Sequence, residues 1–429
     1  MRHLRSFIAA CALAGTTTAG AAEVTRIASS FEDDKPFSMF VDVGLERTQT
    51  RSLITREALR DVGGSLQVEE QPELFYTEYD TRLKFEAHIG IYRNLELRFA
   101  VPLVFQKDEH LRYAGGMGPG NSTVTNNCLQ ADGSPTAPGC VPGGPGAVPL
   151  FGVPFETFRG GVGNMEFGLR YRIFEQAEDP SKPDWIVAFD YTAPTADLLD
   201  PSVPATTDAR GNIGDRNHRY AMTTAISRRM GIADPYFSAT YSFPFRGPGW
   251  YSNCDNANSG NMAHPGNCGN EEWSRYETGI KAPQTLGMTF GTELNLPADQ
   301  RVPQRFVIDL RGMVTYVGEG RYYNALSGPM GKLLATGDYL QMGGSLAVIA
   351  QPADFVRLHA RASLAHNTGY SLTGESLGKD LNGNGRVDPD AGSPELNPNF
   401  DHRIDGPATR FRATENSVFT LNLMLDFVF

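Results

Sequence analysis

The sequence predicts an all-β protein, a transmembrane antiparallel up-and-down β-barrel of about 12 strands with long external loops. Its last fourteen residues alternate between large apolar and mixed polar side chains and stop on Phe429. Similar segments recur evenly along the chain, and the mean hydropathy is -0.32. No segment after the first 22 residues approaches the roughly 20 apolar residues that a membrane helix needs. We therefore expect a signal peptide, residues 1–22, followed by one barrel domain, residues 23–429.

The N-terminus follows the order of a secretory signal peptide, with basic, apolar and then small residues. Two arginines precede an apolar stretch, residues 7–14, and a run of small residues, 16–22. Ala19-Gly20-Ala21 is an acceptable cleavage tripeptide. We therefore expect the mature chain to begin near Ala22 or Glu23.

Alternating segments are the expected strands, because period-two patterning puts successive side chains on opposite faces. They are Phe37–Arg47, Asp80–Tyr92, Leu95–Gln106, Val162–Phe174, Trp185–Thr192, His218–Met230, Pro235–Phe245, Trp273–Leu296, Gln304–Gly318, Gly337–Ala350, Asp354–Ala365 and Asn416–Phe429. An even count is what single-chain bacterial barrels have, with both ends of the chain in the periplasm. Ala282-Pro283 leaves open whether the segment that it interrupts is one strand or two.

The connections alternate in length, as they do in outer-membrane barrels. The short ones are predicted on the periplasmic side, at 93–94, 175–184, 231–234, 297–303 and 351–353. The long ones are predicted outside, at 48–79, 107–161, 193–217, 246–272, 319–336 and 366–415. This asymmetry favours a membrane barrel over a soluble β-sandwich, in which the same alternation would turn the apolar face to a core.

The last strand carries its apolar residues on one face. Phe419, Leu421, Leu423 and Phe429 fall together, and Asp426 lies on the other face. A closing strand of this kind with an aromatic final residue is typical of outer-membrane barrels. We therefore expect a location in the bacterial outer membrane, in contact with its lipid, and recognition of this strand by the barrel-assembly machinery.

Charged residues alternate with apolar ones in the expected strands. Arg or Lys at the bilayer midplane costs about 2–4 kcal/mol, so these residues should face the lumen. The expected lumen residues are Lys84, Glu86, Glu96, Arg98, Glu166, Arg170, Arg172, Asp190, Glu293, Asp309, Arg311, Arg357, His359, Arg361 and Asp426. They either line a pore that sorts permeants by charge and size, or form a salt-bridge network that fills a narrow barrel. The arginines would favour anions only if carboxylates do not neutralise them.

The cysteines predict two short disulfide loops. Cys11 lies in the signal peptide, in a stretch that resembles a lipoprotein box, so its lipidation is the alternative to removal. The other four form two local pairs, Cys128 with Cys140 and Cys254 with Cys268. Three connectivities are possible, and we expect the local one. Disulfides require an oxidising compartment, which agrees with export.

Residues 380–388 match the first nine positions of a calcium-binding loop. The candidate ligands are Asp380, Asn382, Asn384, Arg386 through its carbonyl, and Asp388. The twelfth position is Ala391 where a carboxylate is expected, and Asp390 or Glu395 could substitute. The sequence leaves open a calcium ion in an external loop or a solvated turn, and it indicates no other cofactor.

No catalytic residue is predicted, and we do not expect an enzyme. His359, Ser363, His366 and Ser371 fall near the expected external end of one strand and keep a rim hydrolase as an alternative. Nothing in their spacing fixes a nucleophile and base, and no Gly-x-Ser-x-Gly elbow is present.

Two stretches resemble the outer-membrane barrels linked to meta-pathway phenol degradation, which are of the transporter type. One reads GVGNMEFGLRYRI from Gly161 and continues after a turn as AFDYTAPT from Ala188, and the other reads NLELRFAVP from Asn94. The chain departs from the family at Asn164, where the family has Asp, and at Ala196, where it has Gly. The shared motif is a strand pattern, so the aromatic or hydrophobic permeants that it implies are a family-level expectation.

The net charge of -11 excludes a nucleic-acid-binding stripe, so no nucleic acid is expected as a partner. We expect a passive channel or transporter for a small organic permeant, hydrophobic or aromatic by the resemblance. The alternatives left open are a plugged barrel with a structural or surface-loop binding role, and a rim hydrolase.

Overall fold

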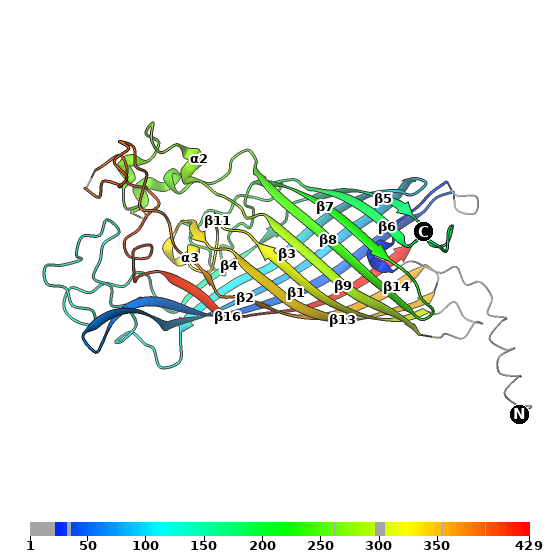
Figure 1. The fold of residues 1–429 in the computed structure, drawn as a ribbon, viewed down its shortest axis with the longest axis horizontal. Coiled ribbons are helices and arrows are strands. Elements are labelled where there is room, and N and C mark those ends of the chain that lie inside the picture. Colours follow the sequence, from blue (N-terminus) through cyan, green and yellow to red (C-terminus); the bar gives the residue numbers. More distant parts are fainter. Residues whose placement is uncertain (1–21, 32–35, 261, 297–304, 354, 391) are drawn as a thin grey trace, which may run out of the picture.

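The computed structural model describes residues 22–31, 36–260, 262–296, 305–353, 355–390 and 392–429. These residues form a tilted, closed barrel with folded loops gathered at one end (Figure 1). The expected signal peptide, apart from Ala22, lies outside the described residues, so it stays a prediction.

The barrel wall has twelve strand positions in the described residues, one of which is shared by the short strands β4 and β5. The strands are β1 (Met39–Val62), β2 (Ser65–Tyr92), β3 (Leu95–Tyr113), β4 (Phe155–Val162), β5 (Glu166–Phe174), β6 (Asp184–Thr192), β7 (Asn217–Ser227), β8 (Ala233–Arg246), β9 (Thr285–Leu296), β10 (Arg305–Val317), β13 (Tyr339–Ala353), β14 (Val356–Asn367) and β16 (Phe411–Val428). Neighbours in sequence pair antiparallel, and β1 also pairs with β16 to close the barrel. The predicted fold class is confirmed.

The outer face of the wall is apolar and the inner face is polar. On β16, Phe419, Leu421 and Leu423 are 47%, 41% and 46% exposed, whereas Asp426 on the other face is 1% exposed. Exposed apolar side chains continue around the wall, for example Phe189 on β6. An apolar outer belt around a polar lumen is the arrangement of a barrel in lipid, not of a soluble sandwich.

Several predicted boundaries are wrong at the external end, where β3 continues to Tyr113 and β16 begins at Phe411. The segment 48–79, expected as a loop, continues as β1 and β2 in a long hairpin that projects past the other strands (Figure 1). Near the wall the hairpin packs on the external loops through Ile54 and Leu74, whereas its tip is exposed at Leu59 and Val68. Because these surroundings change along the hairpin, it carries no sustained apolar alternation. The expected strand Trp273–Leu296 is also shorter, because helix α2 (Arg275–Thr278) precedes it and β9 begins at Thr285.

The expected strand Val162–Phe174 is interrupted. β3 pairs with β5 along its inner half and with β4 along its outer half. Between the two, Gly163 donates its N–H to the Pro102 carbonyl at 2.8 Å. A side chain at Gly163 would meet the Pro102 ring, so the glycine permits this close crossing.

The external loops contain short elements and both disulfides. The elements are η3 (Asn253–Ser259), η4 (Pro265–Asn267), α2, β11 (Gly320–Tyr322), α3 (Ser327–Met330), β12 (Leu334–Thr336) and β15 (Tyr370–Ser371). No helix in the described residues is long and apolar enough to cross a membrane. Cys128 is bonded to Cys140 and Cys254 to Cys268, so the expected local pairing is confirmed.

Candidate functional site

An ion-pair network crosses the middle of the lumen. Arg98 on β3 reaches Glu86 at 2.5 Å, Glu166 at 2.7 Å and Asp190 at 3.1 Å, and Lys84 reaches Glu86 at 2.7 Å and Glu166 at 3.0 Å. These residues come from β2, β3, β5 and β6, so the network ties one side of the wall together. All five are among the residues expected in the lumen, and a pore-lining role for them stays a prediction.

His88 links this network to further buried acids. Its Nδ1 lies 2.7 Å from Glu96 Oε1, and its Nε2 lies 3.4 Å from Asp42 Oδ2. Asp42, Glu86 and His88 each place a potential metal-ligand atom within 4.8 Å of the others. Glu86 and His88 are already held in ion pairs, so we assign the three side chains to the ion-pair network of the lumen.

The N-terminal segment, residues 22–31, lies inside the lumen at the end where β16 finishes (Figure 1). Its short helix η2 (Glu23–Thr25) follows Ala22, which is fully buried. Val24 and Ile27 pack on Ile186 and Ala225 of the inner wall. No sequence pattern predicted this segment, because ten residues without periodicity carry no signal for a position inside a barrel.

Polar contacts hold this segment on several strands. Arg26 pairs with Asp426 at 2.6 Å and lies 3.6 Å above the Phe40 ring. Glu23 pairs with Arg357 at 2.9 Å. Ala28 donates its N–H to Glu96 at 2.6 Å. The segment therefore occupies the periplasmic end of the lumen in this structure.

The remaining expected lumen arginines also have carboxylate partners. Asp309, which is fully buried, pairs with Arg311 at 2.6 Å and with Arg361 at 3.1 Å. Arg172 pairs with Glu175 at 2.8 Å, and Arg170 approaches Glu96 at 3.6 Å. Because carboxylates neutralise the predicted arginine-rich strands, their charge gives no preference for anions.

The residues considered for a rim hydrolase are not brought together. His359 lies on the inner face three residues after β14 begins, near the periplasmic turn, so its expected external position is wrong. His366 lies on the outer face of the same strand, opposite to Ser363. The Nε2 atom of His359 has no hydrogen-bond partner among the described residues. This arrangement offers no nucleophile and base.

The candidate calcium loop folds as a turn around its first residue. Asp380 accepts the backbone N–H groups of Gly383 and Gly385 at 2.7 and 2.6 Å. The buried Glu395 side chain accepts the N–H groups of Leu381 and Asp388 at 3.1 and 2.7 Å. Glu395 therefore contacts both ends of the loop, as expected of a residue that substitutes for the twelfth calcium ligand. Calcium binding itself stays a prediction.

The outer end of the barrel is filled by a buried apolar cluster. It comprises Ile54, Leu74, Tyr76, Leu111, Val124, Phe151, Leu326, Met330, Leu334, Leu372, Ile404, Phe411 and Ala413. These residues join β1–β3 and β16 to three external loops. The loops are therefore packed onto the wall, with their own core.

A pocket of about 340 Å³ lies at the external end, between the wall and the loops that follow β6, β8 and β10. Its lining combines apolar, aromatic and polar side chains: Lys107, Asn164, Leu198, Leu199, Ile213, Asp215, Arg219, Tyr251, Ile280, Pro283, Tyr322, Tyr323 and Leu333. We call it the outer pocket. No motif predicted it, because three separate loops contribute most of its lining, and β3, β7 and the β4–β5 connection contribute one residue each.

The tyrosines of the outer pocket are held as neutral hydrogen-bonding groups. Burial raises the pKa of Tyr251 to about 12, and it raises the pKa of Tyr322 and Tyr323 further above the usual range. Tyr323 donates to Glu109 at 2.7 Å, and the Arg159 guanidinium lies 4.9 Å from its ring centre. The pocket thus offers aromatic faces with fixed orientation.

Two other cavities differ in character. A polar cavity of about 300 Å³ in the lumen is lined by Asp42, Arg82, Lys84, Glu86 and Glu166 among others. An apolar groove of about 630 Å³ lies on the outer wall over β5–β8.

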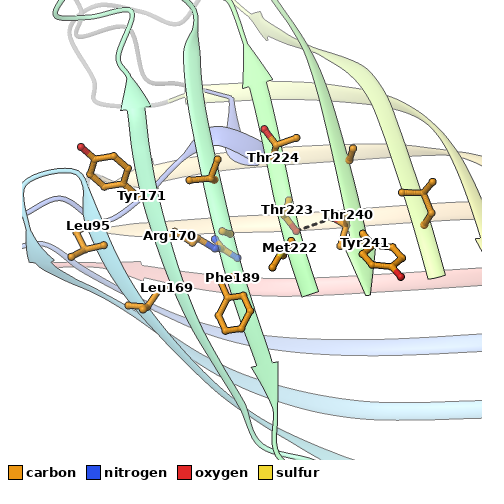
Figure 2. Close-up of a pocket in the computed structure, with 14 residues that line it drawn as sticks. Leu95, Leu169, Arg170, Tyr171, Phe189, Met222, Thr223, Thr224, Thr240 and Tyr241 are labelled. Carbon is orange, nitrogen blue, oxygen red and sulfur yellow. Dashed lines mark hydrogen bonds between the residues drawn. The ribbon is translucent and has the colours of Figure 1, made fainter. Parts of the chain in front are cut away.

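Figure 2 shows the groove, with Leu169, Phe189 and Tyr241 around it. Thr223 and Thr240, which share a 2.9 Å hydrogen bond, belong to the lumen-facing register behind it. The strands there remain paired, so we assign the groove to the lipid-facing surface.

Comparison with known proteins gives structural neighbours at low similarity. No family model matches the chain. No curated protein matches it either. An outer-membrane channel from Pseudomonas putida F1 is 11% identical, with 91% of this chain and 95% of that chain covered and a TM-score of 0.42. A FadL homologue from Pseudomonas aeruginosa is 9% identical, with 91% and 90% covered and a TM-score of 0.38.

The TodX monoaromatic hydrocarbon channel, as a deltaS2 mutant, is 8% identical, with 92% and 90% covered and a TM-score of 0.33. At these values none of the three supplies residue correspondences or a function for this chain. Its own architecture, a closed barrel of even strand number with a lipid-facing apolar belt, is that of a protein of the bacterial outer membrane.

Proposed function

We propose that the chain is an outer-membrane channel for small hydrophobic or aromatic molecules, and that the outer pocket is its uptake site. The lining of this pocket carries the proposal, since three tyrosines meet leucine and isoleucine side chains at the external end of a barrel. Its volume of about 340 Å³ lies in the range of roughly 300–1,000 Å³ that is typical of small-molecule sites. The resemblance to phenol-degradation barrels implies permeants of the same kind, and it supports the proposal in this respect.

The N-terminal segment occupies the periplasmic end of the lumen, so transport through that end requires the segment to move. The N-terminal segment is the element that can move, since its main chain belongs to no wall strand and ion pairs and a small apolar contact hold it. Displacing it would join the polar lumen to the periplasm without breaking the sheet. The wall itself is continuous and has no comparable movable part among the described residues.

The test is solute flux into proteoliposomes. We expect flux of a small aromatic solute such as toluene to exceed that of a polar solute of equal size. Ile280→Asp puts a charge into the apolar part of the outer pocket, where Ile280 is 4% exposed, and should reduce aromatic flux about tenfold. Val141→Asp, at a 57% exposed external site, is the matched control and should change nothing. Equal loss in both variants would contradict the proposal.

A plugged barrel with a structural role is the second candidate. It is favoured by the paired lumen charges and the apolar cluster that fills the outer end. If neither solute enters through the wild type or through a variant without the N-terminal segment, the plugged barrel is the better description.

A further inference from the structure

Two buried acids on the inner wall lack a cationic partner of good geometry. Asp234 on β8 and Glu293 on β9 stand opposite each other in the strand pairing, and both are 0% exposed. Among the described residues, neither carboxylate oxygen of Asp234 has a hydrogen-bond partner. Of the two oxygens of Glu293, only Oε1 has one. Two adjacent carboxylates that are buried without a paired cation destabilise the folded protein.

The side chains around this pair do not supply the missing charge. Arg305 approaches Glu293 only to 3.9 Å and donates instead to Asn295 at 2.9 Å. Arg229 acts on Asp234 from the neighbouring turn, but Asp184 adds further negative charge beside it. The site therefore has an excess of negative charge that faces the start of the N-terminal segment.

The backbone of that segment is what the two acids meet. Glu23 donates its N–H to Glu293 Oε1 at 2.8 Å. The backbone nitrogen of Ala22 faces Asp234, and Ala22 is 0% exposed. The residues just before Ala22 in the sequence are the small tripeptide Ala19-Gly20-Ala21, which has the form of a leader-peptidase site.

We propose that the Ala21–Ala22 bond is the processing site of this chain, and that the α-ammonium freed at Ala22 is the cation of the Asp234–Glu293 pair. Hydrolysis adds one water across the peptide bond, so Ala21 leaves as a carboxylate and the Ala22 amine takes up a proton. The new ammonium has three N–H donors and a full positive charge, where the intact peptide has one neutral donor. Processing thus creates the anchor that docks residues 22–31 in the lumen.

The proposal goes beyond the channel function and stands whether or not the barrel conducts. Cleavage one residue later would leave Asp234 without its facing nitrogen. Cleavage earlier would place neutral peptide and extra residues against the buried acids. The inference therefore commits to one N-terminus.

The first test is the intact mass of the protein purified from outer membranes, with sequencing of its N-terminal peptide. We expect Ala22 as the first residue. Any other mature N-terminus overturns the proposal.

The second test is the reactivity of the Ala22 amine toward an acylating reagent, followed in the N-terminal peptide by mass spectrometry. Two facing carboxylates favour the protonated, unreactive amine, so the folded wild type should react at least about tenfold more slowly than the unfolded chain. Asp234→Asn with Glu293→Gln should remove most of this protection, whereas Glu319→Gln at the exposed external rim should not.

Heat modifiability on a gel establishes that each variant has folded before it is labelled. Equal reactivity of the folded wild type and the unfolded chain overturns the proposal even if the double variant does not fold. Unchanged protection in a folded double variant overturns it as well.

Discussion

Asp405 lies buried in the external loop between β15 and β16, and burial raises the pKa of its carboxyl to about 7. Because the pKa in the fold exceeds the ordinary value of 3.8, the neutral carboxyl favours the folded loop. This contribution to the stability of the loop is complete below pH 3.8 and is lost as the pH rises through about 7.

We therefore expect the protease resistance of this loop to fall as the pH rises from about 4 to about 7. Asp405→Asn, which keeps a neutral group there, should flatten the dependence, and Asp390→Asn at an exposed site should not. The measurement is limited proteolysis across this range. A steep fall that persists in Asp405→Asn would disprove the assignment.

A second residue-scale prediction concerns the buried pair of Lys332 and Asp401. Their side chains are 1% and 0% exposed, with Nζ 3.0 Å from Oδ2. Asp401 also pairs with Arg403 at 2.7 Å, so Lys332→Met removes one of its two cationic partners and should cost roughly 2 kcal/mol in local opening of the loops. The exposed pair of Lys281 with Glu319 is the control, and Lys281→Met should cost below about 1 kcal/mol. Hydrogen exchange of the loop amides measures both, and similar effects would refute the prediction.

At the scale of elements, the disulfide between Cys254 and Cys268 holds the segment that carries η3 and η4. Its sequence separation is 14 residues, for which loop closure predicts roughly 3 kcal/mol of stabilisation. The same segment continues to Tyr251 and Ile280 of the outer pocket. Local opening there should therefore weaken ligand binding.

We expect the double substitution Cys254→Ser, Cys268→Ser to reduce toluene binding at the outer pocket while the barrel keeps its heat modifiability. Cys128→Ser with Cys140→Ser removes the other disulfide, whose loop does not line the pocket, and serves as the control. Isothermal titration is the measurement. Equal loss of binding in both pairs would show that the effect is general rather than local.

The sequence predicted the wall far better than the site. A strand between lipid and lumen must alternate, so the pattern from Phe419 to Asp426 is visible without a structure. The hairpin extension of β1 and β2 was missed because it leaves the lipid, packing on loops at Ile54 and Leu74 and meeting water at its tip, so no single alternating pattern runs along it. The outer pocket was missed for a different reason, since Leu198, Tyr251 and Tyr322 come from separate loops and meet only after folding.

At the scale of the whole molecule, the lumen is divided into three layers. The N-terminal segment occupies the periplasmic end, the network around Arg98 crosses the middle, and the apolar loop cluster fills the outer end. Only the first of these is held without main-chain pairing to the wall. Its removal is therefore the change that distinguishes a gated channel from a permanently filled barrel.

Deletion of residues 24–31 should raise single-channel conductance in a planar bilayer, because it removes Arg26 and the apolar contact of Ile27 from the lumen. Arg26→Ala breaks the ion pair with Asp426 alone and should give brief openings instead of a steady increase. Arg228→Ala, at an exposed turn of the same end, is the control and should leave conductance unchanged. If the deletion variant folds and still does not conduct, the central network seals the lumen by itself. The proposal that a permeant passes through this barrel would then have to be abandoned.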